Sequence, residues 1–132
     1  MAAVDDVDLE FELPAPSDVV FEYLTRIDLL TTWWPTGGRT DPREGGEYVL
    51  EWDGPGVTLR GRYVVVDPPA RLQFTWSWDH DDDESVVSIE LMSSSVDSTS
   101  MRIRQTASSV EERDGYVEGW THFVGRLAER LR

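Results

Sequence analysis

The sequence has no cysteine, no lysine and only two histidines, His80 and His122, among its 132 residues. Without cysteine the chain cannot form a disulfide, supply a thiolate nucleophile or build a cysteine-ligated zinc or iron–sulfur site. Two histidines are too few for a three-histidine metal centre within one chain. His80 lies in an acidic stretch that favours its charged form, and His122 is expected on the exposed side of a helix. We therefore expect no metal ion, no cofactor and no catalytic residue.

Positive charge is also scarce. Twelve arginines stand against 26 Asp and Glu residues, and the formal net charge is −14. This excess repels phosphate backbones and anionic lipid surfaces, so we expect no nucleic-acid partner and no membrane insertion. An acid excess without lysine favours a halophilic source, where salt screens the self-repulsion of the chain. An ordinary acidic protein is the alternative.

Long apolar runs are missing as well. No stretch approaches the roughly 18 consecutive apolar residues of a membrane-spanning helix. Residues 1–6 carry neither the basic region nor the apolar run of a signal peptide, so a cytoplasmic location is expected. The hydrophobic content of 39% is sufficient for a core. The length fits one domain covering residues 1–132.

Apolar residues repeat with two different periods along the chain. Helical spacing predicts two short helices after the first strand, the second capped by Asp28 and carrying Trp33 and Trp34. It also predicts a helix over about the last 18 residues, with a broad apolar stripe. Gly37-Gly38 and Gly45-Gly46 are interpreted as turns. A period of two predicts strands over residues 6–13, 47–53, 57–66, 71–78, 87–91 and 101–105.

The connections between the predicted strands are short and rich in turn residues, which forces neighbouring strands to be antiparallel. We therefore expect an α+β fold with the element order β-α-α-β-β-β-β-β-β-α. In this fold a curved antiparallel sheet wraps around the long C-terminal helix, because each element must bury its apolar face. A sheet that curls around one helix leaves a space between them, and the contents of that space decide the function.

Several segments resemble a known superfamily in their order and spacing. They are Pro16–Thr25 followed by Trp33-Trp34, Arg43–Tyr48, Gly61–Leu72 with Thr75-Trp76, and Gly119-Trp120. Together they resemble the SRPBCC superfamily of START and birch-pollen-allergen-like helix-grip proteins. More narrowly, they are similar to the branch named after the C-terminal domain of the activator of the heat-shock protein 90 ATPase. The resemblance implies a helix-grip fold with a central cavity under the C-terminal helix. It leaves the ligand open, since the superfamily includes lipid carriers, hormone receptors, cyclases and co-chaperone domains.

Aromatic residues provide the candidate ligand-binding residues. Six tryptophans are many for this length, and each buried indole N–H needs a hydrogen-bond partner. Gln105 is in phase with Met101 and Ile103, so it is predicted to place a polar group inside the cavity. The alternative is a packed aromatic core with Gln105 bonded to the backbone. The predicted cavity residues are Trp33, Trp34, Trp52, Tyr63, Phe74, Trp76, Trp78, Gln105, Trp120 and Phe123.

Gly119 and Gly125 lie inside the last predicted helix, where each costs about 1 kcal/mol relative to alanine. We favour a close approach of the helix to the sheet beside Trp120 as the reason. Local looseness that admits a ligand is the alternative.

The acidic segment 79–84 carries part of a calcium-loop signature. Asp79, Asp81 and Asp83 fall at positions 1, 3 and 5 of an EF-hand loop, and Glu90 falls at position 12. However, Glu84 occupies the position that requires glycine, and the flanking residues alternate like strands. A solvated hairpin tip with weak cation association is therefore the preferred interpretation.

Three functions remain open. The preferred one is a small-molecule-binding module for a hydrophobic or amphipathic ligand that is lipid-like or aromatic. A protein-interaction domain acting on a chaperone is the second. The third is a cyclase or hydrolase, which would need an inward-facing acid, whereas Glu51, Asp53 and Glu90 are predicted on outer faces or turns. Outward-facing Val64 and Val66 leave room for a homodimer.

Overall fold

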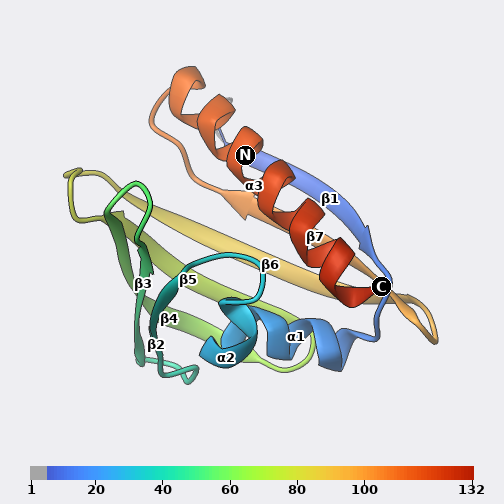
Figure 1. Ribbon diagram of the computed structural model, residues 1–132. Helices are drawn as coiled ribbons and strands as arrows, with labels where there is room; N and C mark the ends of the chain where they lie inside the picture. Colours follow the sequence, from blue (N-terminus) through green and yellow to red (C-terminus); the bar gives the residue numbers. More distant parts are fainter. Residues whose placement is uncertain (1–5) are drawn as a thin grey trace.

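The computed structural model describes residues 6–132, and the order of its elements is the predicted one (Figure 1). Seven strands form one antiparallel sheet in the order β1-β7-β6-β5-β4-β3-β2. The predicted α+β helix-grip architecture is therefore confirmed. The elements are β1 (Val7–Leu13), α1 (Ser17–Thr25), α2 (Ile27–Leu30), β2 (Gly37–Thr40), β3 (Glu47–Trp52), β4 (Val57–Asp67), β5 (Arg71–Trp78), β6 (Glu84–Ser95), β7 (Ser98–Gln105) and α3 (Val110–Leu131).

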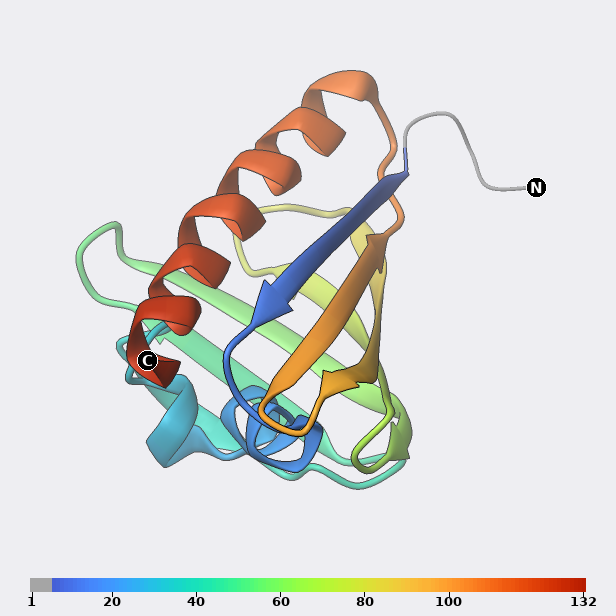
Figure 2. The same ribbon diagram turned by 90° about the vertical axis from the view of Figure 1, so that its right-hand side faces the viewer.

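The sheet curves, and its concave side faces the helices (Figures 1 and 2). The two short helices α1 and α2 connect β1 at one edge of the sheet to β2 at the other edge. The long helix α3 crosses over the same side of the sheet (Figure 2). Because all three helices cover one face, the inward side chains of every second strand position meet there and form the core.

The alternation of buried and exposed residues follows the prediction in most strands. Tyr48, Leu50 and Trp52 of β3 are buried, and so are Leu72 and Phe74 of β5. Such alternation follows directly from backbone geometry, because successive side chains in a strand point to opposite faces of the sheet. The sequence pattern therefore predicted correctly which face of these strands is internal.

Strand β4 departs from its prediction. The pairing register with β5 shifts between Tyr63 and Val65, so one extra residue interrupts the alternation. Beyond this bulge Val66 pairs opposite Leu72 and packs against the core. The prediction that Val66 faces outward was wrong, because a one-residue shift exchanges the two faces of a strand. Val64 remains exposed, so the apolar surface available to a second copy is smaller than expected.

Strand β2 begins at Gly37, where the sequence had been interpreted as a turn. Gly38 has a φ of +138°, and a Cβ atom there would collide with the Val49 carbonyl oxygen of the neighbouring strand. Only glycine tolerates both the conformation and the close approach. This glycine therefore belongs to an edge strand paired with β3.

Helix α3 has 22 residues and starts earlier than predicted. The Ser109 side chain accepts a hydrogen bond from the Glu112 backbone N–H at 3.1 Å. This is the serine half of a capping box, with acidic residues in the first turn that suit the positive end of the helix dipole. The motif Ser109-Val110-Glu111-Glu112 was thus a readable start signal. Within residues 6–132, no helix combines the length and apolarity needed to cross a bilayer.

Candidate functional site

A cavity of about 250 Å³ lies between α3 and the strands β3 to β5. It is partly open to solvent, and almost all of its lining atoms are apolar. Its residues come from the segment after α2, from the β3–β4 hairpin, from β5 and from α3. They are Trp34, Trp52, Pro55, Val57, Trp76, Trp78, Gly115, Tyr116, Gly119, Trp120 and Phe123.

Six of the ten predicted residues line this aromatic cavity, and four lie elsewhere. Trp33 is fully buried, and its Nε1 donates to the Tyr23 carbonyl at 3.0 Å. Tyr63 and Phe74 border a separate void of about 10 Å³, too small for an organic ligand. Gln105 is buried with 1% exposure. The six lining residues are Trp34, Trp52, Trp76, Trp78, Trp120 and Phe123.

Sequence reasoning missed five lining residues. Tyr116 belongs to the apolar stripe recognised on the C-terminal helix, so the stripe could have identified Tyr116 as a lining residue. Gly115 and Gly119 are one helical turn apart, which places them on the same face of α3. Pro55 and Val57 belong to the β3–β4 hairpin, and no sequence signal brings them near α3.

The rings of the lining form an aromatic cluster of Trp34, Trp52, Trp76, Trp78, Tyr116 and Trp120. Trp34 lies at its centre. Its ring centroid lies 5.2 Å from that of Trp120 and 5.8 Å from that of Trp76, with interplanar angles of 38° and 29°. Trp52 meets the same ring edge-on at 5.7 Å and 70°. These separations are typical of favourable aromatic pairs, so the cluster connects α3 to both β3 and β5.

The largest interplanar angles in the cluster are those between the Trp76 ring and two of its neighbours. This ring meets Trp78 at 89° and Tyr116 at 76°, with centroid distances of 5.6 Å and 5.7 Å. The rings around the cavity therefore do not form one parallel slot. They close the space from several directions.

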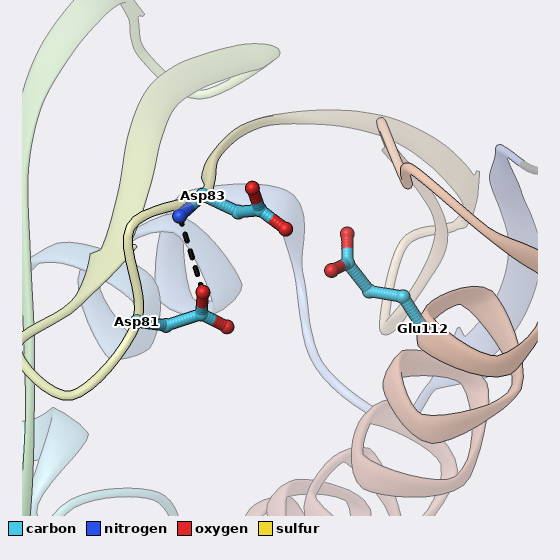
Figure 3. A group of neighbouring side chains, drawn as sticks. All are labelled: Asp81, Asp83 and Glu112. Carbon is cyan, nitrogen blue, oxygen red and sulfur yellow. Dashed lines mark hydrogen bonds between the residues drawn. The ribbon is translucent and has the colours of Figure 1, made fainter.

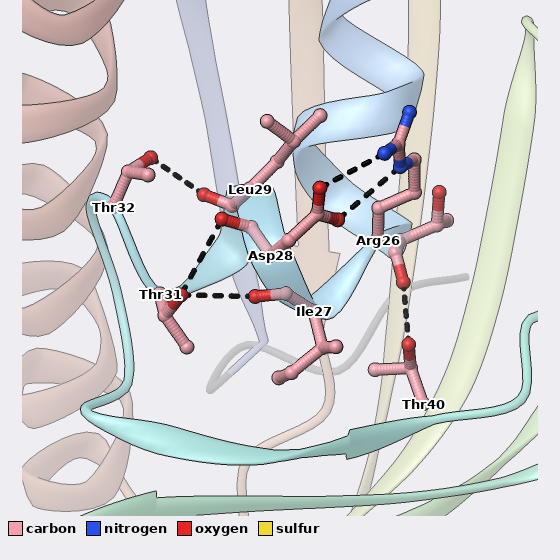
Figure 4. Close-up of polar contacts among 8 residues, drawn as sticks. Arg26, Ile27, Asp28, Leu29, Thr31, Thr32 and Thr40 are labelled. Atoms are coloured by element: carbon pink, nitrogen blue, oxygen red, sulfur yellow. Dashed lines mark hydrogen bonds and ion pairs between the residues drawn. The ribbon is translucent and has the colours of Figure 1, made fainter.

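Two threonine hydroxyls stabilise the turn after α2, which leads to Trp34. The Thr31 hydroxyl donates to the Ile27 carbonyl and the Thr32 hydroxyl to the Leu29 carbonyl, at 3.0 Å and 2.6 Å (Figure 4). Both bonds satisfy carbonyl groups at the C-terminal end of the short helix α2.

The predicted roles around α2 need correction. Asp28 does not cap α2. It accepts two hydrogen bonds from the Arg26 guanidinium, at 3.2 Å and 2.8 Å (Figure 4). The helix ends at Leu30, so Trp33 and Trp34 follow it in a turn and do not share one helical face. Trp34 stacks on buried Trp33 at 5.5 Å and 17°, which holds the Trp34 ring in place.

The indoles of the site differ in whether their N–H group forms a hydrogen bond. Trp52 Nε1 donates to the Trp34 carbonyl at 2.9 Å, and Trp120 Nε1 donates to Gln105 Oε1 at 2.8 Å. Gln105 thus bonds a side chain and not the backbone. Within the described residues, Trp76 Nε1 and Gln105 Nε2 are buried donors that find no partner. Native proteins leave few buried donors unpaired.

The glycines of α3 do not serve helix–sheet packing. Apart from its chain neighbours and the adjacent backbone of α3, a Cβ atom built on Gly119 meets no described atom within 4 Å, and the same holds for Gly115 and Gly125. The favoured explanation of a close approach beside Trp120 was therefore wrong. At Gly115 and Gly119 the missing side chains leave space that belongs to the cavity.

Acidic residues gather near the start of α3. The carboxylates of Asp81, Asp83 and Glu112 lie within 4.8 Å of one another, and Figure 3 shows Glu112 reaching from α3 toward the loop. The Asp83 backbone N–H donates to Asp81 Oδ1 at 3.1 Å. Glu90 pairs with Arg104 at 2.7 Å instead of joining this group. The EF-hand arrangement is thus not formed.

These charges affect the ionisation of Tyr116, which lines the cavity. Burial raises the pKa of Tyr116 to about 12, and the charges of Glu112, Asp81 and Asp83 add to the effect. The phenol therefore stays protonated and neutral at ordinary pH. Among residues 6–132, no Asp, Glu or His is buried, and none of them lines the cavity.

Comparison with solved structures finds the same fold in several proteins. DynU16, from the dynemicin biosynthetic locus, shares 26% identity at a TM-score of 0.86, over 98% of this chain and 48% of DynU16. The chain thus spans about half the length of DynU16. MLL2253 from Mesorhizobium loti shares 26% identity at a TM-score of 0.81, over 96% of this chain and 95% of its own. PFC0360w, an HSP90 activator from Plasmodium falciparum, shares the fold at a TM-score of 0.80 and 19% identity, over 96% of this chain and 95% of its own.

Comparison with curated proteins gives no significant match. A family match, however, covers residues 14–132 and is described as Activator of Hsp90 ATPase homolog 1-like protein. It spans the three helices, strands β2 to β7 and the Gly119-Trp120 pair on which the resemblance was based. The chain therefore belongs to the family of Activator of Hsp90 ATPase homolog 1-like proteins.

Proposed function

We propose that the protein is a non-catalytic module that binds a small amphipathic or aromatic molecule in the aromatic cavity beneath α3. The observation that carries the proposal is the lining itself, in which seven of eleven residues are Trp, Tyr or Phe. Aromatic side chains offer large apolar area together with specific ring geometry, so they recognise ligands at small cost in conformational entropy.

The size of the cavity limits the ligand. An engineered apolar cavity of about 150 Å³ holds benzene, and sites for drug-sized molecules start at about 300 Å³. A volume of about 250 Å³ therefore suits one or two small rings or a short branched group. A whole two-chain lipid would exceed it.

The chemistry of the lining argues against the enzyme alternative. A cyclase or hydrolase would need an acid, a base or a nucleophile at the cavity wall. The lining residues of the described chain offer one phenol, whose pKa is raised, and no carboxylate or imidazole. This composition favours binding over proton transfer.

The proposal is tested with 2-naphthol, a neutral two-ring probe, added to nitrogen-15-labelled protein. The indole N–H signals of Trp76, Trp78 and Trp120 should shift in a saturable manner, and more strongly than that of Trp33, which lies outside the lining. No saturable shift with 2-naphthol, and no bound molecule found by native mass spectrometry against a library of small aromatics and lipids, would refute the proposal.

Two phenylalanines provide a matched pair for this test. Phe123 lines the cavity, whereas Phe11 is equally part-buried but lies on β1. Phe123→Ala should weaken 2-naphthol binding between about two- and twelvefold, since an aromatic pair contributes about 0.5–1.5 kcal/mol. Phe11→Ala should leave the affinity unchanged. Equal losses in the two variants would indicate a general loss of structure.

A second candidate function is interaction with a chaperone. The family match favours it, because that family is described by reference to an Hsp90 ATPase activator. A pull-down with purified Hsp90 in salt-matched buffer tests it directly. Absence of any complex at micromolar concentrations would remove this candidate without affecting the ligand proposal.

A further inference from the structure

We infer that the ligand of the aromatic cavity is an organic cation whose quaternary or tertiary ammonium group is held against the tryptophan faces. This inference rests on the proposed function and names the chemical class of its ligand. Four features of the site support it: the angles between the rings, an existing cation–π contact, the sign of the surrounding charge and the size of the space.

The rings around the cavity differ in orientation, from 29° between Trp34 and Trp76 to 89° between Trp76 and Trp78. Trp76 is nearly perpendicular to Trp78 and to Tyr116, while Trp52 meets Trp78 at 52°. A flat neutral ligand is best held between parallel rings. A round group such as trimethylammonium instead gains from several faces directed at it from different sides, because each ring face carries negative quadrupole density.

One ring of the lining, that of Phe123, already contacts a cation of the protein itself. The guanidinium carbon of Arg126 lies 5.9 Å from the ring centroid of Phe123, within the range of cation–π contacts. Arg126 is an exposed residue and is not among the lining residues. A ligand cation would extend the same type of contact to the tryptophans inside.

Charge around the cavity favours a cation over an anion. The chain carries a formal net charge of −14, and the described lining residues are all uncharged. Glu112 lies four residues before Tyr116 on α3, hence on the same helix face, and Asp81 and Asp83 join it there (Figure 3). Burial is the main cause of the raised pKa of Tyr116, and the charges of these three carboxylates add to it.

The space is suitable for such a group. The volume of about 250 Å³ is well above the roughly 150 Å³ that holds benzene, so a trimethylammonium group with a short chain fits. A quaternary ammonium is only weakly hydrated, and the cavity is partly open to solvent, so moving it from water to aromatic faces is a modest change of environment.

Choline and its neutral isostere 3,3-dimethyl-1-butanol test the inference, because they differ mainly in the charge of the central atom. Calorimetric titration at one salt concentration should show choline binding at least about tenfold more tightly. Tighter or equal binding of the isostere would overturn the inference while leaving the proposed function intact. Binding of 2-naphthol alone, with neither of these probes, would also overturn it. Failure of all three probes would overturn the inference and, together with an empty library screen, would refute the proposed function as well.

A charge-matched pair of variants isolates the acidic group. The triple variant Asp81→Asn, Asp83→Asn, Glu112→Gln should weaken choline binding by about two- to tenfold and leave the affinity for the isostere unchanged. The control, Asp18→Asn, Asp67→Asn, Glu22→Gln, removes the same net charge from exposed positions on α1 and at the end of β4. Equal effects of the two triples would contradict a local role for the carboxylates of the acidic group.

Discussion

Trp120 on α3 donates its indole N–H to Gln105 Oε1 on β7 at 2.8 Å, and both residues are buried. This bond joins the helix to the sheet at the inner edge of the aromatic cluster. It also sets the orientation of an indole that lines the cavity, because the ring can satisfy its N–H only when it faces the amide.

A double-mutant cycle measures this link. Gln105→Leu leaves the buried Trp120 donor unpaired, and Trp120→Phe leaves the Gln105 carbonyl unpaired, each at a cost of about 1–3 kcal/mol. The double variant should recover part of this loss, with a coupling energy of about 0.5–1.5 kcal/mol in the free energy of unfolding by urea. Simple additivity would show that the bond does not contribute.

Two tryptophans differ in whether their indole N–H is satisfied. Trp33 Nε1 donates to the Tyr23 carbonyl, whereas Trp76 Nε1 has no partner among residues 6–132. Trp33→Phe should therefore destabilise the protein by about 1 kcal/mol more than Trp76→Phe, although both lose the same ring volume. Urea unfolding of the two variants measures the difference. A larger loss for Trp76→Phe would mean that its donor is satisfied in solution.

Glycine substitutions in α3 separate stability from binding. Gly119→Ala and Gly125→Ala should each raise the free energy of unfolding by up to about 1 kcal/mol, since neither new methyl group meets a described atom within 4 Å. Only Gly119→Ala should weaken 2-naphthol binding, because Gly119 lines the cavity and Gly125 does not. A loss of affinity in both variants would contradict this assignment.

Stability should fall in alkaline solution. Burial raises the pKa of Tyr116 to about 12 and also raises those of Tyr48 and Tyr63, all from an ordinary value of 10.0. For groups with a raised folded pKa, the stabilisation is complete below the unfolded pKa and is lost as the pH rises through the folded pKa. The free energy of unfolding should therefore decline from about pH 10 upward. Tyr116→Phe should reduce the decline, and an unchanged slope would contradict the assignment.

Salt should stabilise the protein. The net charge of −14 makes the folded chain repel itself, and salt screens this repulsion beyond about 10 Å at 0.1 M. Salt also weakens ion pairs such as Arg102–Asp8 and Arg104–Glu90, but these side chains are about half exposed, so each contributes only about 0–1 kcal/mol. The free energy of unfolding should thus be higher in molar KCl than in 0.1 M KCl. Equal stability in both would refute the halophilic interpretation.

The sequence alone determined most of the helices and strands and the faces that they bury, although it missed β2 as a strand and the bulge in β4. Side-chain alternation in a strand is a local property of the backbone, which is why Tyr48, Leu50 and Trp52 could be placed inside from their spacing. The family resemblance, carried by motifs such as Gly119-Trp120, pointed to the correct family before any contact was known.

Tertiary structure alone decided which inward residues form the site. Trp33 and Trp34 are neighbours in the chain and their rings stack, yet Trp33 is sealed in the core, whereas Trp34 lines the cavity, where its ring packs against those of Trp52, Trp76 and Trp120. The space at Gly119 and the approach of Glu112 to Asp81 depend on how far α3 stands from the sheet. Local periodicity specifies the direction of a side chain, whereas this separation results from the packing of segments far apart in sequence.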